Sequence, residues 1–316
     1  MADNYSTYNS LMKHIRSKGI AIKGSVQKKN LKNVGYYHGY KGYRFKGDFS
    51  HKLAFDSFEQ INAVIEFDNA LKAALYSPLM KLETAIKSHV CDVIVTTVES
   101  SEFSEVFNKG LTTDSKKKQQ TYKARDAIYS SLTKRYEYSA IVKHFYNADK
   151  PVPLWAIFEE LMLGEMSNLI DVLNDDIKLK ISKVLGIPQG MNTNGALLPK
   201  VVLTVKDLRN AVAHNKVIYD GRYMEFKKRN SLMQLLMQET LIPGIKCDSL
   251  FDDVVLVCFL LKNLGFPVDE SRHLVKEIEH ALSTLKTKLP NMLYQDVVSG
   301  FSVNKMLALK KYTRSR

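Results

Sequence analysis

The apolar residues of this chain recur mainly at helical spacing. Between residues 55 and 97 they return every three or four positions, as at Phe58, Ile61 and Ile65, which is typical of an amphipathic helix. No run of useful length alternates apolar and polar residues in the way that a half-buried strand does. The pattern therefore predicts an all-α fold.

Proline, glycine and polar clusters set the expected helix ends. Because a proline inside a helix removes a backbone hydrogen bond, Ser77 and Pro78 divide the segment 55–97 into two expected helices. Polar loops are expected at 112–120 and 186–195. The remaining expected helices cover residues 121–146, 155–173, 175–185, 197–215, 228–241, 249–264 and 269–289, with a basic helix from about residue 295 onward.

Charge is distributed unevenly along the chain. Hydrophobic residues make up 45% of the 316 residues, enough for a substantial core, and the net charge is +13. Residues 1–50 carry ten Lys and Arg against two Asp and Glu, and residues 301–316 carry five against none. This distribution favours a polyanionic partner, although the lysines could also serve only solubility. We expect a basic, aromatic-rich arm over 1–50, a helical core over 51–225 and C-terminal helices over 226–316 packed on that core.

Several classes of protein are not favoured by the sequence. Cys91, Cys247 and Cys258 have no C-x-x-C spacing, which argues against a zinc site or a disulfide framework. No histidine spacing indicates a metal site either, so no metal and no cofactor are expected. The polar N-terminus lacks a signal-peptide core, and the longest apolar run, 254–261, is too short to cross a bilayer. We expect a cytoplasmic protein without a membrane partner.

The arm contains the aromatic segment VGYYHGYKGYRF at residues 34–45. Its glycines predict an extended or turn-rich conformation. Aromatic rings beside cations suit single-stranded nucleic acid, through base stacking and phosphate neutralisation. The alternative is that the tyrosines pack the arm onto the helical body. The candidate RNA-binding residues are Lys28, Lys29, Lys32, Tyr36, Tyr37, Tyr40, Lys41 and Arg44.

The strongest candidate for chemistry is RNAVAH at residues 209–214, inside the expected helix 197–215. It supplies Arg209 as a permanent cation, Asn210 as an amide and His214 as a proton carrier near neutral pH. A ribonuclease that works without metal needs these groups, to stabilise a phosphate, to orient it and to move a proton. We predict that these three residues are catalytic, although so short a motif is weak evidence without its surroundings.

Helix geometry bears on how this motif could act. At 100° per residue, Arg209 and His214 lie about 140° apart, which is a poor arrangement for a single catalytic unit. Two copies facing each other across a twofold axis would surround one phosphate, so the geometry favours a homodimer. The alternative is structural: Arg209 pairs with Asp207 or Glu160, and His214 ends the helix beside its negative dipole.

Four segments in order resemble the Abi (abortive infection) AbiD/AbiF family of bacterial phage-defence proteins. They are LKNVGYYHGYKGYRFK, IEFDNALKAALYSPLMKLETAIKSHV with the acid Glu83, PLWAIFEELMLGEMSNLIDVL, and LRNAVAHN, which matches the Arg-x4-6-His signature of HEPN ribonucleases. The resemblance is collinear from about residue 10 to 225. Where the family usually has an arginine one turn after the acid, this chain has Lys87, which cannot make the planar fork of a guanidinium.

The resemblance implies a HEPN-type helical bundle with additional N- and C-terminal helices. It implies a metal-independent endoribonuclease that acts as a toxin or abortive-infection antiphage effector, with Glu83 and Lys87 supporting a composite site in a dimer. Some family members are restrained by a small structured RNA, so the expected partners are an RNA substrate, such an inhibitor RNA on the basic arm, and a second copy of the chain. The alternative is a non-catalytic RNA-binding module that uses the same basic surface.

Overall fold

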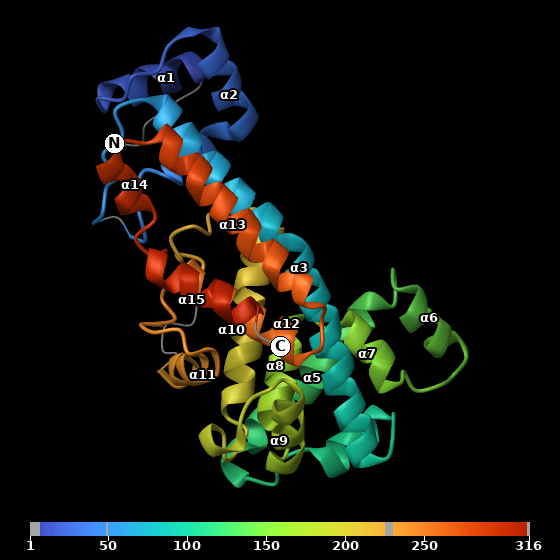
Figure 1. Cartoon of the computed structure of the whole chain (residues 1–316). Coiled ribbons are helices and arrows are strands. Elements are labelled where there is room, and N and C mark those ends of the chain that lie inside the picture. The colour runs from blue at the N-terminus through green and yellow to red at the C-terminus, as the bar shows by residue number, and fades with distance from the viewer. Residues whose placement is uncertain (1–6, 49, 225–229, 315–316) are drawn as a thin grey trace.

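The computed structural model describes residues 7–48, 50–224 and 230–314. Across these residues regular structure is helical and extended segments meet only at isolated bridges, so the predicted all-α fold is confirmed (Figure 1). The α-helices are α1 (Tyr8–Ser17), α2 (Gly24–Tyr36), α3 (Phe58–Val98), α4 (Phe103–Glu105), α5 (Lys118–Arg135), α6 (Ala140–Asn147), α7 (Leu154–Glu160), α8 (Leu163–Val172), α9 (Asp175–Val184), α10 (Leu197–Ala213), α11 (Asn230–Thr240), α12 (Leu250–Asn263), α13 (Val268–Lys288), α14 (Asn291–Val297) and α15 (Val303–Arg314).

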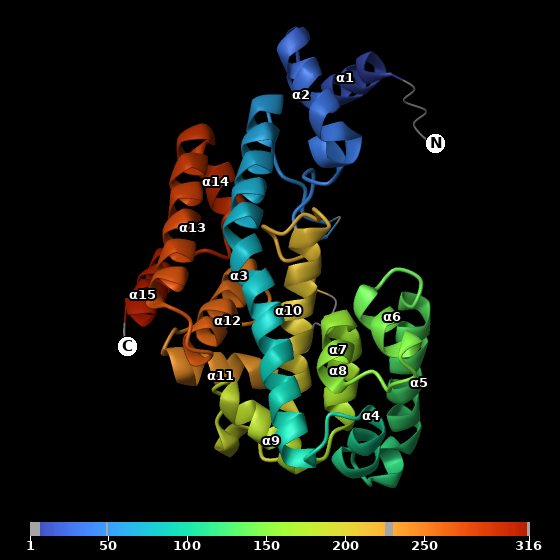
Figure 2. The same ribbon diagram turned by 90° about the vertical axis from the view of Figure 1, so that its right-hand side faces the viewer.

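The long helix α3 organises the packing of the molecule. Helix α13 lies alongside it, and α7, α9, α10 and α12 also pack against it (Figures 1 and 2). The expectation of two helices here is wrong, because α3 continues through Pro78. Pro78 is buried, and so are Leu75 and Leu79 on either side of it. Packing across the proline therefore keeps the helix continuous despite the lost backbone hydrogen bond.

The expected helix 155–173 is instead broken in the middle. Leu161 and Met162 have extended backbones, with ψ angles of 137° and 149°, so α7 ends and α8 begins there. The Met162 backbone N–H donates a hydrogen bond of 2.9 Å to the Glu165 carboxylate, which caps the start of α8.

The expected helix 121–146 is also two helices, α5 and α6. Helix α5 begins inside the expected polar loop at Lys118 and ends at Arg135. Ser139 starts α6, since its hydroxyl accepts a hydrogen bond from the Val142 N–H at 3.3 Å. The break between α5 and α6 lies near the break between α7 and α8, because α5 packs on α7.

Most of the described N-terminal arm is helical. Helix α2 runs to Tyr36 with a kink at Gly35, whose φ is 74°, and a π-helical turn over Tyr37–Lys41 follows. The expectation of an extended or turn-rich segment at 34–45 is therefore wrong for most of 34–41, whereas residues 42–44 do form a turn and a bend. A Cβ atom on Gly39 would lie 2.7 Å from the Leu31 side chain, so the glycine serves close packing here and does not break the helix. Helices α1 and α2 pack on each other at one end of the molecule (Figure 1).

The remaining expected helices are found with small changes at their ends. Segments 175–185, 197–215, 249–264 and 269–289 correspond to α9, α10, α12 and α13. The start of the expected helix 228–241 and the boundary at 225–226 lie outside the described residues. The basic C-terminal segment forms two helices, α14 and α15, rather than one. Within the described chain, no helix has both the length and the hydrophobicity that crossing a membrane requires.

Candidate functional site

A cleft of about 380 Å³ lies between α3, the end of α5, the α7–α8 junction and α10. Figure 2 shows α10 between α3 on one side and α7 and α8 on the other. Five residues that sequence reasoning selected line this cleft: Arg209, Asn210, His214, Glu83 and Lys87. Its lining is completed by Arg135, Glu159, Glu160, Leu161, Met162, Leu163, Gly164 and Lys206.

Glu83 holds two cations of the cleft. Its carboxylate accepts a hydrogen bond of 2.6 Å from the Arg209 Nε and lies 3.3 Å from the Lys87 Nζ. Arg209 also donates from Nη1 to the Asn210 side-chain oxygen at 3.1 Å. These two bonds fix the guanidinium plane and leave its Nη2 group without a partner among the described residues. The side chain of Arg209 is 29% exposed, so this remaining donor can meet a ligand in the cleft.

His214 lies at the C-terminal end of α10 and is exposed. Its backbone N–H donates to the Asn210 carbonyl at 3.0 Å, which holds the residue on the last helical turn. Among the described residues its imidazole makes no hydrogen bond or ion pair, so the ring is available to a substrate. It is also the one histidine in the described lining of the cleft.

Arg209 forms neither of the ion pairs expected if its role were only structural. Arg209 pairs with Glu83, whereas Asp207 lies 3.0 Å from the Lys206 Nζ and Glu160 accepts a bond of 3.0 Å from Arg135. Counted along its lining, the cleft holds four Lys and Arg side chains and three Glu side chains. Protonation of His214 would add a further positive charge, so the cleft can accept an anionic group.

A buried carboxylate beneath the end of α10 was not predicted from the sequence. Asp68 is fully buried on α3 and accepts hydrogen bonds from the backbone N–H groups of Ile218 and Tyr219, at 2.9 and 2.8 Å. It also accepts a bond of 2.8 Å from the Tyr43 hydroxyl and lies 3.0 Å from the Lys72 Nζ. The segment that follows the motif is therefore fixed to α3 through one side chain.

Lys72 extends this network to the residue after the motif histidine. Its ammonium group donates a bond of 2.6 Å to the side-chain oxygen of Asn215. Asn215 has a φ of 51°, a left-handed conformation that asparagine tolerates better than most residues and that ends the helix. Sequence spacing could not have related Lys72 to Asn215, because 143 positions separate them and only the packing of the fold brings them together.

The predicted RNA-binding residues of the arm are divided between surface and core. Lys29, Lys32, Tyr37 and Lys41 are exposed, and Lys28, Tyr36 and Arg44 are half-buried. Tyr40 is only 1% exposed, so its ring packs in the core and cannot stack on a base. Arg44 lies over the Phe45 ring, 4.9 Å from its centroid.

Other reactive groups are placed unfavourably for catalysis. Burial raises the pKa of Cys91 to about 11 and that of Cys258 to about 12, so both thiols stay protonated near neutral pH. In the described ranges, no three His, Cys, Asp or Glu side chains are grouped as ligands for a metal ion.

Comparison with known proteins places this arrangement in a family. A family model described as Abi-like protein matches residues 29–220, which is more than half of the chain. The chain belongs to the Abi-like protein family. The match covers α3, the cleft and the Asp68 network, and membership links the chain to abortive infection, an antiviral defence. Neither the curated proteins nor the solved structures gave a match.

Proposed function

We propose that this Abi-like protein is a metal-independent endoribonuclease of the HEPN type, with its active site in the cleft at the end of α10. The observation that carries the proposal is the meeting of Arg209, Asn210 and His214 in one polar cleft, with the imidazole exposed and unpaired among the described residues. An arginine donor, an amide and a free imidazole are among the groups that RNA cleavage without metal uses.

The proposed reaction is an internal transfer at one RNA phosphate. The 2′-hydroxyl oxygen attacks the adjacent phosphorus while its proton passes to the His214 imidazole. The bond from phosphorus to the 5′-oxygen breaks, that oxygen takes a proton from a second general acid, and a 2′,3′-cyclic phosphate and a 5′-hydroxyl result. Arg209 stabilises the negative charge that develops on the phosphate oxygens, and Asn210 holds the guanidinium through the bond at 3.1 Å.

Cleavage by matched pairs of variants tests this assignment. His214→Ala and Arg209→Ala are each expected to lower the cleavage rate about a hundredfold or more, because each removes a separate contribution to the transition state. His273→Ala and Arg272→Ala, on the exposed surface of α13, serve as controls and should cleave like the parent. The assay follows labelled RNA in excess EDTA and identifies the cyclic phosphate end.

The same assay contains the outcomes that contradict the proposal. Cleavage by His214→Ala at the parental rate, or a parental activity abolished by EDTA, would remove the assignment. Tight RNA binding by the parent without cleavage would instead support the non-catalytic RNA-binding module.

We further propose that the basic arm holds a small structured RNA that restrains the enzyme. Lys29, Lys32 and Lys41 are exposed on the arm, and Tyr37 is 53% exposed beside them. Protein purified with its neighbouring genes should carry nucleic acid, seen as a high ratio of absorbance at 260 to 280 nm. Replacing the three lysines should weaken this binding and flatten its dependence on salt, because fewer counterions are released. Protein free of nucleic acid after native purification would contradict the role of the arm.

A further inference from the structure

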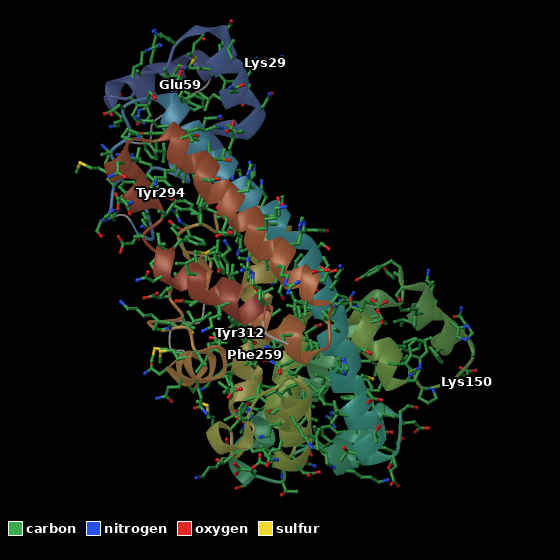
Figure 3. All side chains as sticks on the ribbon, in the orientation of Figure 1. Lys29, Glu59, Lys150, Phe259, Tyr294 and Tyr312 are labelled. Atoms are coloured by element: carbon green, nitrogen blue, oxygen red, sulfur yellow. The ribbon has the colours of Figure 1, made fainter. Side chains whose placement is uncertain are left out.

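A second surface of the molecule presents exposed aromatic rings. On α5, in the α5–α6 connection, on α6 and at the start of α7, large aromatic side chains are between 42 and 70% exposed; they are Tyr122, Tyr129, Tyr136, Tyr138, Tyr146 and Trp155, here called the aromatic face. Exposed apolar groups gathered in this way mark a surface that binds a partner. The arm lies elsewhere: Figure 3 labels Lys29 on α2 and Lys150 just after α6, on separate parts of the molecule.

Three of these rings are regularly spaced along one helix. Tyr122 and Tyr129 lie on α5, and Tyr136 directly follows its last residue with helical backbone angles. The three are seven residues apart, which is close to two helical turns, so they lie on one side of the helix over about 21 Å. Each ring is braced by another aromatic ring: Phe107 lies 5.7 Å from Tyr122 and Phe103 lies 5.5 Å from Tyr129, between ring centroids. Tyr146 lies 5.5 Å from Tyr136 in the same way. The rings are therefore held in place before a partner binds.

The charge of this surface identifies the class of partner. Residues 51–300 have no net charge, but residues 116–150 within them carry nine Lys and Arg against three Asp and Glu. Arg125 stands over the Tyr122 ring at 4.7 Å from its centroid. Rings interleaved with cations bind nucleic acid bases and phosphates together. A second copy of this chain would bring the same positive surplus to the contact, which disfavours a homodimer through this face.

The aromatic face ends at the cleft. Arg135, which lines the cleft and pairs with Glu160, directly precedes Tyr136, the last ring on the α5 stripe. Ser139 donates from its hydroxyl to the same Glu160 at 2.6 Å, so the α5–α6 junction is bonded to a residue of the cleft wall. An RNA strand bound along these three rings would therefore reach the cleft that contains the motif residues 209–214.

We propose that the aromatic face is the binding track for single-stranded RNA, with Tyr122, Tyr129 and Tyr136 stacking on unpaired bases. This inference rests on the proposed nuclease function and adds the form of its substrate and the path it follows. Unpaired bases expose their faces to aromatic side chains, whereas those of a duplex are stacked on each other and hidden. The track therefore selects single strands over duplexes.

The test measures RNA binding in the full chain carrying His214→Ala, so that binding is observed without turnover. A fluorescein-labelled twelve-nucleotide single strand of mixed sequence is titrated against this protein, and the same strand in a duplex is titrated in parallel. On this background, Tyr122→Ala, Tyr129→Ala and Tyr136→Ala are each expected to weaken binding of the single strand about tenfold. The corresponding phenylalanine variants keep the ring and should bind like the parent.

Controls separate the track from general effects. Tyr76→Ala removes an exposed tyrosine of α3, outside the aromatic face, and should leave the affinity unchanged. Lys123 is exposed and follows Tyr122 on α5. Lys123→Ala should lower the affinity and reduce its dependence on salt, whereas the tyrosine variants should keep the parental salt dependence. Thermal unfolding of every variant confirms that the fold is retained.

The outcomes distinguish this inference from the proposed function. Unchanged affinity in all three alanine variants overturns the track, whatever the cleavage assay shows. If the alanine variants bind single-stranded RNA about tenfold more weakly but the parent protein does not cleave RNA, the track is supported and the nuclease assignment is removed. A change in oligomeric state on sedimentation, with unchanged RNA affinity, overturns the track and assigns the face to a protein contact.

Discussion

Two stacked tyrosines show how much the environment of a single hydroxyl matters in this protein. The rings of Tyr43 and Tyr219 are buried and nearly parallel, with centroids 6.0 Å apart. The Tyr43 hydroxyl donates to buried Asp68, whereas the Tyr219 hydroxyl is buried without a partner among the described residues. A bond to a buried carboxylate stabilises the fold, and an unpaired buried hydroxyl destabilises it.

Phenylalanine substitutions at these positions should therefore have different effects. Tyr43→Phe should lower the free energy of unfolding by about 1.5–3 kcal/mol at pH 7, because a bond to a charged acceptor is lost. Tyr219→Phe keeps the stacked ring and removes only the unpaired hydroxyl, so it should be neutral or slightly stabilising. Urea unfolding followed by circular dichroism measures both. Equal losses in the two variants would contradict the assignment of the hydroxyl partners.

The same residues predict a loss of stability at alkaline pH. Burial, followed by the negative charge of nearby aspartates, raises the pKa of both phenols above the ordinary value of 10. The unfolded chain ionises these phenols near pH 10 while the folded protein keeps them protonated, so their contribution is complete below pH 10 and is lost as the pH rises further. Tyr219→Phe should reduce the slope of unfolding free energy against pH above 10, by up to about 1.4 kcal/mol per pH unit. An unchanged slope would contradict the raised pKa.

At the scale of residues, the sequence could predict the motif but not the buried side chains that hold the segment after it. Arg209, Asn210 and His214 are close together in the chain, so a short sequence motif is enough to predict their chemistry. The residues that fix the segment after the motif, Asp68 and Lys72, lie on α3 more than a hundred positions earlier. An acidic and a basic residue at i and i+4 of an amphipathic helix look like a surface pair. Only packing shows that both are buried.

At the scale of elements, the sequence predicted helices well and their continuity less well. Propensity and periodicity are local, and they located α9, α10, α12 and α13 closely. Continuity depends on tertiary packing, which carried α3 through Pro78. It depends as well on caps such as Ser139, whose hydroxyl starts α6 and also contacts α7. The break between α7 and α8 matters for function, because it places Leu161 and Met162 in the wall of the cleft.

The link between α3 and the end of α10 can be tested by removing its central carboxylate. Asp68→Ala should destabilise the protein by roughly 3–5 kcal/mol, because it leaves the buried Lys72 ammonium uncompensated and two backbone N–H groups unpaired. Asp269→Ala removes a carboxylate that is 90% exposed and pairs only at the surface, so it should cost less than about 1 kcal/mol. Chemical denaturation of both variants gives the comparison.

A variant that retains part of the Asp68 network separates stability from activity. Asp68→Asn keeps an oxygen acceptor and the side-chain volume, so it should fold better than Asp68→Ala. It should still cleave RNA more slowly than the parent, because the segment after His214 is held less firmly. Cleavage at the parental rate in folded Asp68→Asn would show that the network serves stability alone.

At the scale of the whole molecule, a single cleft contains only one of the two proton carriers that the proposed cleavage needs. Cleavage needs a base for the 2′-hydroxyl and an acid for the departing 5′-oxygen, and one imidazole cannot fill both states at once. His214 is the one histidine of the described cleft, and its ring is open to the outside. A homodimer that brings two clefts together would supply the second imidazole. Light scattering should then give twice the chain mass of 36.0 kDa.

Mixing the parent with an inactive variant tests whether such a dimer shares its active site. In an exchanged equal mixture of the parent and His214→Ala, a quarter of the dimers are parental and half contain one chain of each kind. If each phosphate needs the imidazoles of both chains, the mixed dimers are inactive and about a quarter of the parental activity should remain. If each chain holds a complete site, about half of the parental activity should remain. We expect a quarter, because a single cleft lacks the second proton carrier. A mixture that keeps half of the activity after proven exchange would place the complete site within one chain, and the single-variant cleavage assay would still decide whether that site is a ribonuclease.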